Sequence, residues 1–73
     1  MKPLRMAVLG AGLIGRKHIQ TILSMPHLAD LAAVADPVAD PCQFDLKGAK
    51  WFSDPREMLD RIKPEAVVIA TPN

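Results

Sequence analysis

Three glycines in the spacing Gly10-x-Gly12-x-x-Gly15 constrain the fold of this chain more than any other feature. A short apolar run at residues 6–9 ends at the first glycine, and a helical pattern follows the last. Because this run is continuous rather than alternating, it is typical of a strand that is buried on both faces of a parallel sheet. The sequence therefore predicts a strand, a tight glycine turn and a helix in direct succession.

The helix that follows the turn is expected to begin near Gly12 and to end before Pro26. A second continuous apolar run, at residues 31–35, then completes a strand–helix–strand unit whose crossover should be right-handed. The apolar face of the helix would consist of Gly15, Ile19, Ile22 and Leu23.

Two further helices and two further strands are predicted downstream. Residues 40–43 (Asp-Pro-Cys-Gln) have the form of a helix start, with Asp at the N-cap and Pro at the first helical position, and Gly48 would end that short helix. A short strand at residues 49–52 is expected to follow it. Residues 54–57 (Asp-Pro-Arg-Glu) repeat the start signal as a capping box, and residues 66–70 would form the last strand.

The order of these elements predicts an α/β fold of three layers, with helices on both faces of a parallel sheet. The expected strand order is 3-2-1-4, as in a Rossmann-type fold that is truncated after its fourth strand. Residues 67–69 would then form a bare apolar edge, so we expect the isolated chain to self-associate.

Each glycine has a physical task if the turn receives a phosphate group. Gly10 permits the tight turn, Gly12 lets a cofactor pyrophosphate approach the backbone, and Gly15 lets the helix lie close to the sheet. The free N–H groups of Leu13 and Ile14, in the first turn of the helix, would point at the phosphates, and the helix dipole adds to their attraction.

Asp36 stands at the end of the second predicted strand, 21 residues after Gly15. An acid at this position reaches the adenosine ribose of a dinucleotide and accepts hydrogen bonds from its hydroxyls. A 2′-phosphate would be repelled by the carboxylate, and residues 37–39 include no Lys or Arg to receive it, so we predict NAD rather than NADP as the cofactor. The alternative interpretation of Asp36 is the cap of a turn before Pro37.

Three residues follow the last predicted strand. In an open α/β sheet, ligands bind beyond the carboxyl ends of the strands, where the strand order reverses. Strands one and four flank that point, so we assign Thr71, Pro72 and Asn73 to the cofactor site. An ordinary loop role is the alternative for these residues.

These motifs together resemble the amino-terminal domain of the Gfo/Idh/MocA oxidoreductases. The resemblance rests on residues 10–15 with His18, residues 34–37 and residues 65–73, and it covers nearly the whole chain. It implies hydride transfer between a nicotinamide cofactor and a hydroxyl or carbonyl group of a sugar, a cyclitol or a similar polyol. It also implies that the glycine turn, Asp36 and the Thr71–Asn73 segment contact the cofactor.

Two departures from the family pattern bear on function. Residues 38–48 are shorter than the family's usual second helix and are interrupted by Pro41. The chain also stops before the family's Lys after a fifth strand and before the catalytic Asp and His of its second domain. We therefore expect residues 1–73 to be the amino-terminal part of a dinucleotide-binding domain, without catalytic residues or a substrate domain. We expect the parent protein to be a homo-oligomer.

Composition and charge argue against several other classes of protein. The formal net charge is +1 and no basic run exceeds Arg16-Lys17, so we expect no nucleic-acid partner. No apolar stretch reaches the about 18–20 residues of a membrane span, and no signal peptide is evident, so we expect no membrane association. The single cysteine, Cys42, allows no disulfide framework or cysteine metal cluster, and it favours a cytoplasmic protein.

Two other functions stay open at this level. The same fold would serve a non-catalytic nucleotide-binding or sensing module, and the glycine turn by itself also suits an FAD or S-adenosylmethionine domain. The remaining expectations are a structural or packing role for His18, a solvated helix face at Arg16 and Lys17, and core positions for Trp51 and Phe52.

Overall fold

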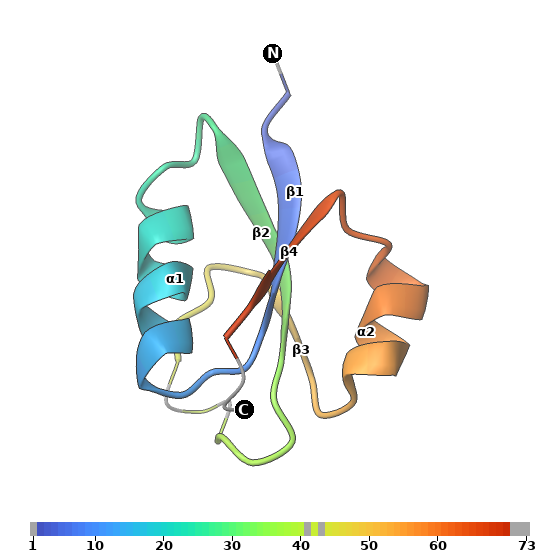
Figure 1. Cartoon of the computed structure of the whole chain (residues 1–73). Coiled ribbons are helices and arrows are strands. Elements are labelled where there is room, and N and C mark those ends of the chain that lie inside the picture. The colour runs from blue at the N-terminus through green and yellow to red at the C-terminus, as the bar shows by residue number, and fades with distance from the viewer. Residues whose placement is uncertain (1, 41, 43, 71–73) are drawn as a thin grey trace.

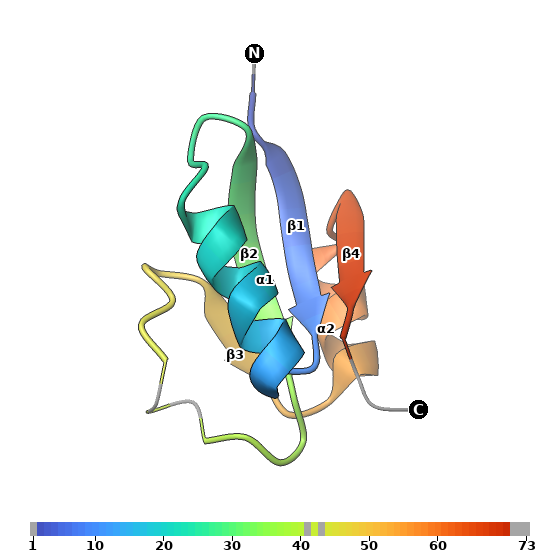
Figure 2. The ribbon, with the colours of Figure 1, turned by 60° about the vertical axis from the view of Figure 1, so that its left-hand side comes forward.

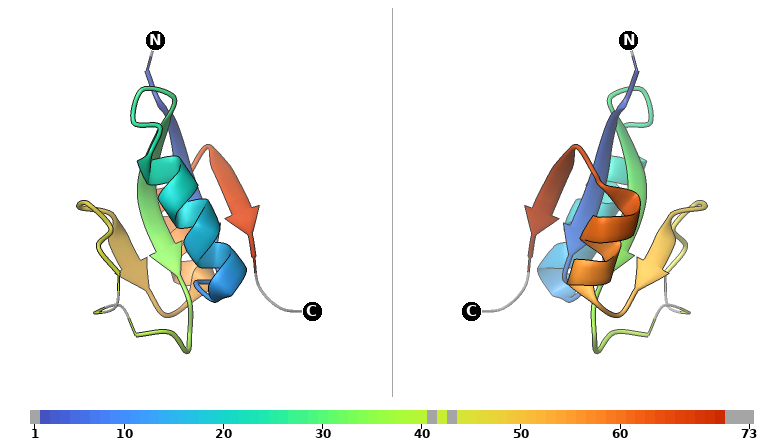
Figure 3. Two further views of the ribbon diagram at one scale, coloured as in Figure 1. Left: turned by 90° about the vertical axis from the view of Figure 1, so that its left-hand side faces the viewer. Right: turned by 90° about the vertical axis from the view of Figure 1, so that its right-hand side faces the viewer.

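The computed structural model describes residues 2–40, 42 and 44–70 of the chain. In this part of the chain, the four strands form one parallel sheet in the order β3-β2-β1-β4. Helix α1 covers one face of the sheet and α2 the other, so the predicted strand order and three layers are confirmed (Figure 1; Figure 3). The elements are β1 (Leu4–Leu9), α1 (Leu13–Leu23), β2 (Ala29–Ala35), β3 (Lys50–Phe52), α2 (Pro55–Ile62) and β4 (Ala66–Ile69).

The two central strands are buried on both faces, as their continuous apolar runs predict. Val8 of β1 is in register with Val34 of β2 on one side and with Val68 of β4 on the other. Both central strands begin two residues earlier than the apolar runs indicate, because their pairing starts at Leu4 and Ala29. The residues with 0% exposure in these strands are Ala7, Val8, Ala33 and Val34.

The sheet separates two apolar layers. On the α1 side, Ile19 and Ile22 of the helix belong to one cluster with Val8 and Val34 of the sheet. On the α2 side, Met58 is fully buried against alanines of β1 and β2. The predicted apolar face of the first helix is confirmed by the buried residues Gly15, Ile19 and Ile22, with Leu23 half-buried at its edge.

The connection from β2 to β3 contains no α-helix among its described residues, so the predicted helix after Asp40 is wrong. Figure 2 shows the residues of this connection that the structure describes as an irregular loop. The Asp40 carboxylate accepts a hydrogen bond from the Cys42 N–H at 2.9 Å, and the Asp45 carboxylate accepts one from the Lys47 N–H at 3.2 Å. These local bonds compete with a helix because they satisfy backbone donors in turn conformations.

Apolar side chains of this loop cover the sheet where a helix was expected. Phe44 and Leu46 pack against the core on the α1 side, and the Phe44 ring centroid lies 5.3 Å from that of Trp51. The Arg16 guanidinium lies 4.8 Å from the centre of the Phe44 ring, so Arg16 contacts the loop as well as solvent. Trp51 and the neighbouring Phe52 are half-buried in opposite layers, in agreement with their predicted core positions.

Helix α2 begins with the Asp-Pro signal that the sequence predicts. The Asp54 carboxylate accepts a hydrogen bond from the Arg56 N–H at 3.0 Å, and Pro55 occupies the first turn, where it leaves no N–H to satisfy. The full capping box is not formed, because Glu57 pairs with Arg61 one turn later, at 3.3 Å between Oε1 and Nε. In the part of the chain that the structure describes, the side chain of Asp54 alone therefore caps this helix.

Arg5 joins the end of α2 to the beginning of β1. Its guanidinium donates to the carbonyl oxygen of Ile62 at 2.8 Å and to that of Lys63 at 3.3 Å. A cation at the C-terminus of a helix is favourable, because the last carbonyl groups carry partial negative charge. The backbone N–H of Arg5 also donates to the Glu65 carboxylate at 2.9 Å, so the chain is pinned on both sides of the turn before β4.

Strand β4 forms one edge of the sheet. Among the described strands it pairs with β1 alone, and Ile69 at its end is 72% exposed. The expected apolar edge is therefore confirmed, whereas self-association through it stays a prediction. Neither helix of the described structure is long and apolar enough to cross a membrane.

Candidate nucleotide-binding site

The glycine turn lies between the carboxyl end of β1 and the start of α1. Gly10 has a φ of 98°, which favours glycine, and its N–H donates to the Ala35 carbonyl at the end of β2 at 2.8 Å. A Cβ on Gly15 would lie 2.0 Å from the carbonyl oxygen of Gly10. The tight turn at Gly10 and the close approach at Gly15 are confirmed, because the helix folds back directly onto the turn, whereas their part in cofactor binding stays a prediction.

The N-terminus of α1 is left open by its own sequence. Gly12 is the N-cap, and in the described structure neither a side-chain cap nor an acidic residue serves the first turn. The first backbone bond of the helix runs from the Arg16 N–H to the Gly12 carbonyl, so the N–H groups of Leu13 and Ile14 precede the helical ladder. A Cβ on Gly12 would meet no described atom within 4 Å. This end of the helix therefore offers donors, positive potential and space to an anion.

Asp36 lies where the second strand ends and faces the glycine turn. Its Oδ2 atom accepts a hydrogen bond from the Ala11 N–H at 2.6 Å. Its Oδ1 atom accepts bonds from the Val38 N–H at 2.7 Å and the Ala39 N–H at 2.8 Å. The carboxylate thus caps a turn at residues 36–39, which includes Pro37 instead of preceding it as the alternative interpretation had it. It also reaches the turn that follows β1.

The pKa of the Asp36 carboxyl lies below its ordinary value of 3.8. Partial burial raises this pKa, but the three backbone N–H donors stabilise the charged form and together outweigh the burial. The group is therefore a carboxylate at neutral pH, and both of its oxygens act only as acceptors.

A cavity of about 490 Å³ connects these features, and its size is in the range of small-molecule sites. Val38, at its rim, is 90% exposed and presents an apolar surface. Ala70 lines the cavity at the end of β4, but the predicted contacts Thr71, Pro72 and Asn73 lie outside the described residues. The lining residues are Gly10, Gly12, Asp36, Pro37, Val38, Ala39 and Ala70.

These residues fit the ADP half of a dinucleotide. The open space at Gly12 and the uncapped helix suit a pyrophosphate, and the Asp36 carboxylate suits the hydroxyls of the adjoining ribose. The apolar rim at Val38 suits a base. The described residues hold no cluster of three or more His, Cys, Asp or Glu side chains that would bind a metal, so no metal ligand is assigned.

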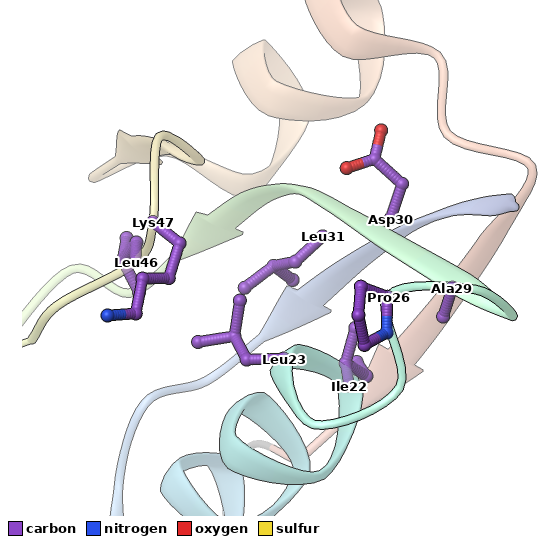
Figure 4. Close-up of a pocket in the computed structure, with 8 residues that line it drawn as sticks. All are labelled: Ile22, Leu23, Pro26, Ala29, Asp30, Leu31, Leu46 and Lys47. Atoms are coloured by element: carbon purple, nitrogen blue, oxygen red, sulfur yellow. The ribbon is translucent and has the colours of Figure 1, made fainter.

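A second cavity, of about 340 Å³, lies at the opposite end of β2 (Figure 4). It is bounded by Ile22 and Leu23 of α1, by Leu31 of β2 and by the loop at Leu46. In Figure 4 the carboxylate of Asp30 is turned away from these apolar side chains. This cavity includes no residue that the sequence assigns to a site, and its lining extends the core.

Some predicted roles near the site need correction. His18 is exposed on α1 and does not line the cavity, so the packing part of its expected role is wrong, and a structural role stays a prediction. The sequence analysis missed the backbone donors of Ala11, Val38 and Ala39, which bind the Asp36 carboxylate. The Asp-Pro step gave a signal for the turn at residues 37–39, because Asp side chains bond to backbone N–H groups two or three residues on.

The fold and the cavity define an α/β protein of the dinucleotide-binding class. Residues 4–73 match the family model of the Gfo/Idh/MocA proteins, which is described as an oxidoreductase family with an NAD-binding Rossmann fold. The match covers nearly the whole chain, and the protein belongs to this family.

The individual relatives that the chain resembles in sequence include dehydrogenases. The chain is 40% identical over 72 residues to an inositol 2-dehydrogenase of Pseudarthrobacter chlorophenolicus and 37% identical over 71 residues to a scyllo-inositol 2-dehydrogenase (NAD(+)) of Bacillus subtilis. These alignments cover 94% and 93% of the chain but 21% of each relative. The chain thus spans about one fifth of the length of the curated relatives that it matches.

Solved structures share the fold. The crystal structure of scyllo-inositol dehydrogenase from Lactobacillus casei, with bound NAD(H) and scyllo-inositol, matches with a TM-score of 0.83 and 25% sequence identity. A D-galactose-1-dehydrogenase protein from Rhizobium etli matches with a TM-score of 0.76 and 26% identity. The chain is covered to 97% and 99% in these two comparisons, and each of the solved chains to 22%.

Proposed function

We propose that this chain binds the ADP half of NAD(H). The observation that carries the proposal is the pairing of an uncapped helix N-terminus at Gly12 with the Asp36 carboxylate across one cavity. The N–H groups of Leu13 and Ile14 would hold the pyrophosphate, and Asp36 would accept hydrogen bonds from the adenosine ribose. Thr71, Pro72 and Asn73 are proposed as further contacts, because they follow Ala70 at the rim.

The charge of Asp36 underlies the proposed preference for NAD over NADP. A 2′-phosphate on the ribose would stand against a carboxylate, and like charges in such contact cost several kcal/mol. Residues 37–39 supply no Lys or Arg that would offset the repulsion. The lowered pKa of Asp36 keeps this negative charge in place at neutral pH.

The proposed reaction of the whole protein is hydride transfer between the nicotinamide and a hydroxyl or carbonyl group of a polyol. Family membership supports an oxidoreductase, and the inositol and galactose dehydrogenases among the relatives support a cyclitol or sugar as the substrate class. Bound nicotinamide supplies the hydride chemistry. We assign residues 1–73 to the amino-terminal part of the dinucleotide-binding domain, and we assign no catalytic residue within them.

The remaining expectations about the whole protein stay proposals. The near-neutral charge agrees with the absence of a nucleic-acid partner, and the single cysteine agrees with a cytoplasmic protein. A homo-oligomeric state and the absence of a membrane partner are proposed as well. The size of the protein in solution would test the homo-oligomeric state.

Calorimetric titration of the chain with NADH and, separately, NADPH tests the proposed function. We expect tighter binding of NADH, and we expect Asp36→Ala to weaken NADH binding and to narrow the difference between the two cofactors. Asp54→Ala is the matched control, because it removes a carboxylate that caps the other helix and does not line the cavity. A folded chain that binds neither cofactor would contradict the proposal, and equal affinities would contradict the preference for NAD.

A further inference from the structure

Hydrogen bonds hold the backbone of the glycine turn, residues 10–12, at its start, its middle and its end. At the start of the turn, the Gly10 N–H donates to the Ala35 carbonyl at 2.8 Å. At its end, the Gly12 carbonyl accepts from the Arg16 N–H at 2.9 Å. Between them, the Ala11 N–H donates to Oδ2 of Asp36 at 2.6 Å. In the described part of the chain, Asp36 is thus the side chain that holds the middle of the turn.

Water can replace the hydrogen bond from the Ala11 N–H less easily than the one from the Val38 N–H. Ala11 is 2% exposed and belongs to the core cluster under α1. A buried N–H without an acceptor is costly, because it has lost its water and gained no partner. Val38, whose N–H donates to the other oxygen, is 90% exposed, so water readily replaces that bond.

The two oxygens of the Asp36 carboxylate differ in the number of hydrogen bonds that they accept. A carboxylate offers about four lone-pair positions, two on each oxygen. Among the described residues, Oδ1 already accepts from two backbone donors, whereas Oδ2 accepts from Ala11 alone. A ribose that donates two hydroxyls can take the remaining position on Oδ2 and exchange with an exposed donor on Oδ1. The Ala11 bond can persist through this exchange.

We propose that Asp36 is a positioning residue for the phosphate-binding turn in addition to its contact with ribose. Its Oδ2 atom holds Ala11, and through Ala11 the residues 10–12, in the shape that receives a pyrophosphate, before any ribose is bound. This role rests on the proposed function, because a turn that receives no phosphate needs no such shape. It extends that function by linking the ribose contact to the phosphate contact through one side chain.

Amide hydrogen exchange in the ligand-free chain tests the anchor directly. We expect the Ala11 amide to exchange faster in Asp36→Ala than in the unchanged chain. The Ala70 amide, which donates to the Leu9 carbonyl at 2.8 Å, is the internal control and should keep its rate relative to global unfolding. Equal exchange of Ala11 in the unchanged chain and in Asp36→Ala, which has no side-chain acceptor, would overturn the proposal.

Titration with inorganic pyrophosphate, which has no ribose, tests the consequence. A residue that contacts only ribose would leave pyrophosphate affinity unchanged, or raise it when Asp36→Ala removes a negative charge. If Asp36 is a positioning residue, the change has the opposite sign, and Asp36→Ala should lose pyrophosphate affinity severalfold. Asp54→Ala is the control for general destabilisation, and its pyrophosphate affinity should be unchanged. Tighter or equal binding in Asp36→Ala would overturn the positioning role.

The two proposals fail in different ways. If the unchanged chain binds NADH and only the pyrophosphate and exchange results go against expectation, the positioning role fails and the cofactor site stands. If the folded chain binds neither NADH nor pyrophosphate, the proposed function fails as well. Should pyrophosphate bind too weakly to titrate while NADH binds, the exchange rate of Ala11 decides the question.

Discussion

Both helices of this protein begin at the carboxyl ends of the parallel strands (Figure 1). They differ in what their first N–H groups meet. Helix α2 begins with an aspartate whose carboxylate caps it, a proline that has no N–H, and Glu57 in its first turn. Helix α1 begins at Gly12, and within the described structure it has neither a side-chain cap nor an acid in its first turn. At α2 the Arg56 N–H is bound by the Asp54 carboxylate, whereas at α1 the N-cap residue Gly12 lines a cavity.

This difference is consistent with the ligand that we propose for the N-terminus of α1. An aspartate cap and an early glutamate stabilise a helix, because they complement the positive end of its dipole. A chain selected for stability alone would use them at both helices. At α1 the carboxylate is instead supplied by Asp36 from the next strand, and it binds Ala11 rather than the first turn of the helix. The following predictions test this contrast.

The largest effect is expected from Gly15→Ala. The new Cβ would lie 2.0 Å from the Gly10 carbonyl oxygen, a backbone atom that cannot move aside as a side-chain tip does. We expect a loss of stability beyond the roughly 1–3 kcal/mol of ordinary overpacking, measured by urea unfolding. Gly12→Ser is the matched control, since no described atom lies within 4 Å of its Cβ and Ser is a good N-cap. A stable Gly15→Ala variant would show that the close contact is not required.

Gly12→Asp would give α1 the kind of cap that α2 has. We expect unfolding free energy within about 0.5 kcal/mol of the unchanged chain, because Asp and Gly are both accepted N-caps. NADH affinity should fall by at least about tenfold, since a carboxylate would stand where the pyrophosphate binds. Calorimetry on Gly12→Asn separates charge from bulk, because Asn has the same shape without the charge. Unimpaired NADH binding by Gly12→Asp would mean that the phosphates lie elsewhere.

Asp54→Ala removes the carboxylate that caps the N-terminus of α2. We expect a loss of about 1 kcal/mol in unfolding free energy, because the Arg56 N–H loses its acceptor. NADH affinity should stay the same, since Asp54 does not line the cavity. Asp54→Asn should retain most of the stability, because an amide oxygen also caps. A drop in NADH affinity in Asp54→Ala would contradict the separate roles of the two helix ends.

The smallest effect is expected in the loss of folding stability at acid pH. The folded-state pKa of Asp36 is below its ordinary value of 3.8, so the stability that it contributes is present above about that pH. This contribution is lost as the pH falls through the lower, folded-state pKa. We expect Asp36→Asn to lose less stability than the unchanged chain when unfolding is compared between neutral pH and strongly acid pH. A steeper acid loss in the variant would contradict the lowered pKa.

Much of the fold could be predicted because its signals are local. The glycine spacing, the two continuous apolar runs and the Asp-Pro start of α2 each specify an element within a few residues, and the sheet order follows from their sequence. The helix predicted after Asp40 was wrong for a tertiary reason. Phe44 and Leu46 pack against the α1-side core from a loop, and the Asp40 and Asp45 side chains stabilise turns.

The candidate site shows the same division between local and long-range information. The positions of Gly10, Gly12 and Gly15 and of Asp36 follow from motif spacing. The bond from Asp36 to Ala11 spans 25 residues and depends on the pairing of β1 with β2, so no local pattern reports it. The contact between Arg16 and Phe44 likewise depends on where the long loop returns to the sheet.

The position of β1 in the sheet has a consequence for how the protein folds as it is made. β1 is the first of the four described strands to be synthesised, yet one of its two neighbours, β4, is the last. The bond from the Arg5 N–H to Glu65 closes a separation of 60 residues, whereas β1, α1 and β2 lie close together in sequence. Long-range pairing must overcome its loop-closure entropy before its contacts form, so we expect β4 to dock last. The glycine turn and Asp36 would then be assembled on a nascent chain whose sheet is still incomplete.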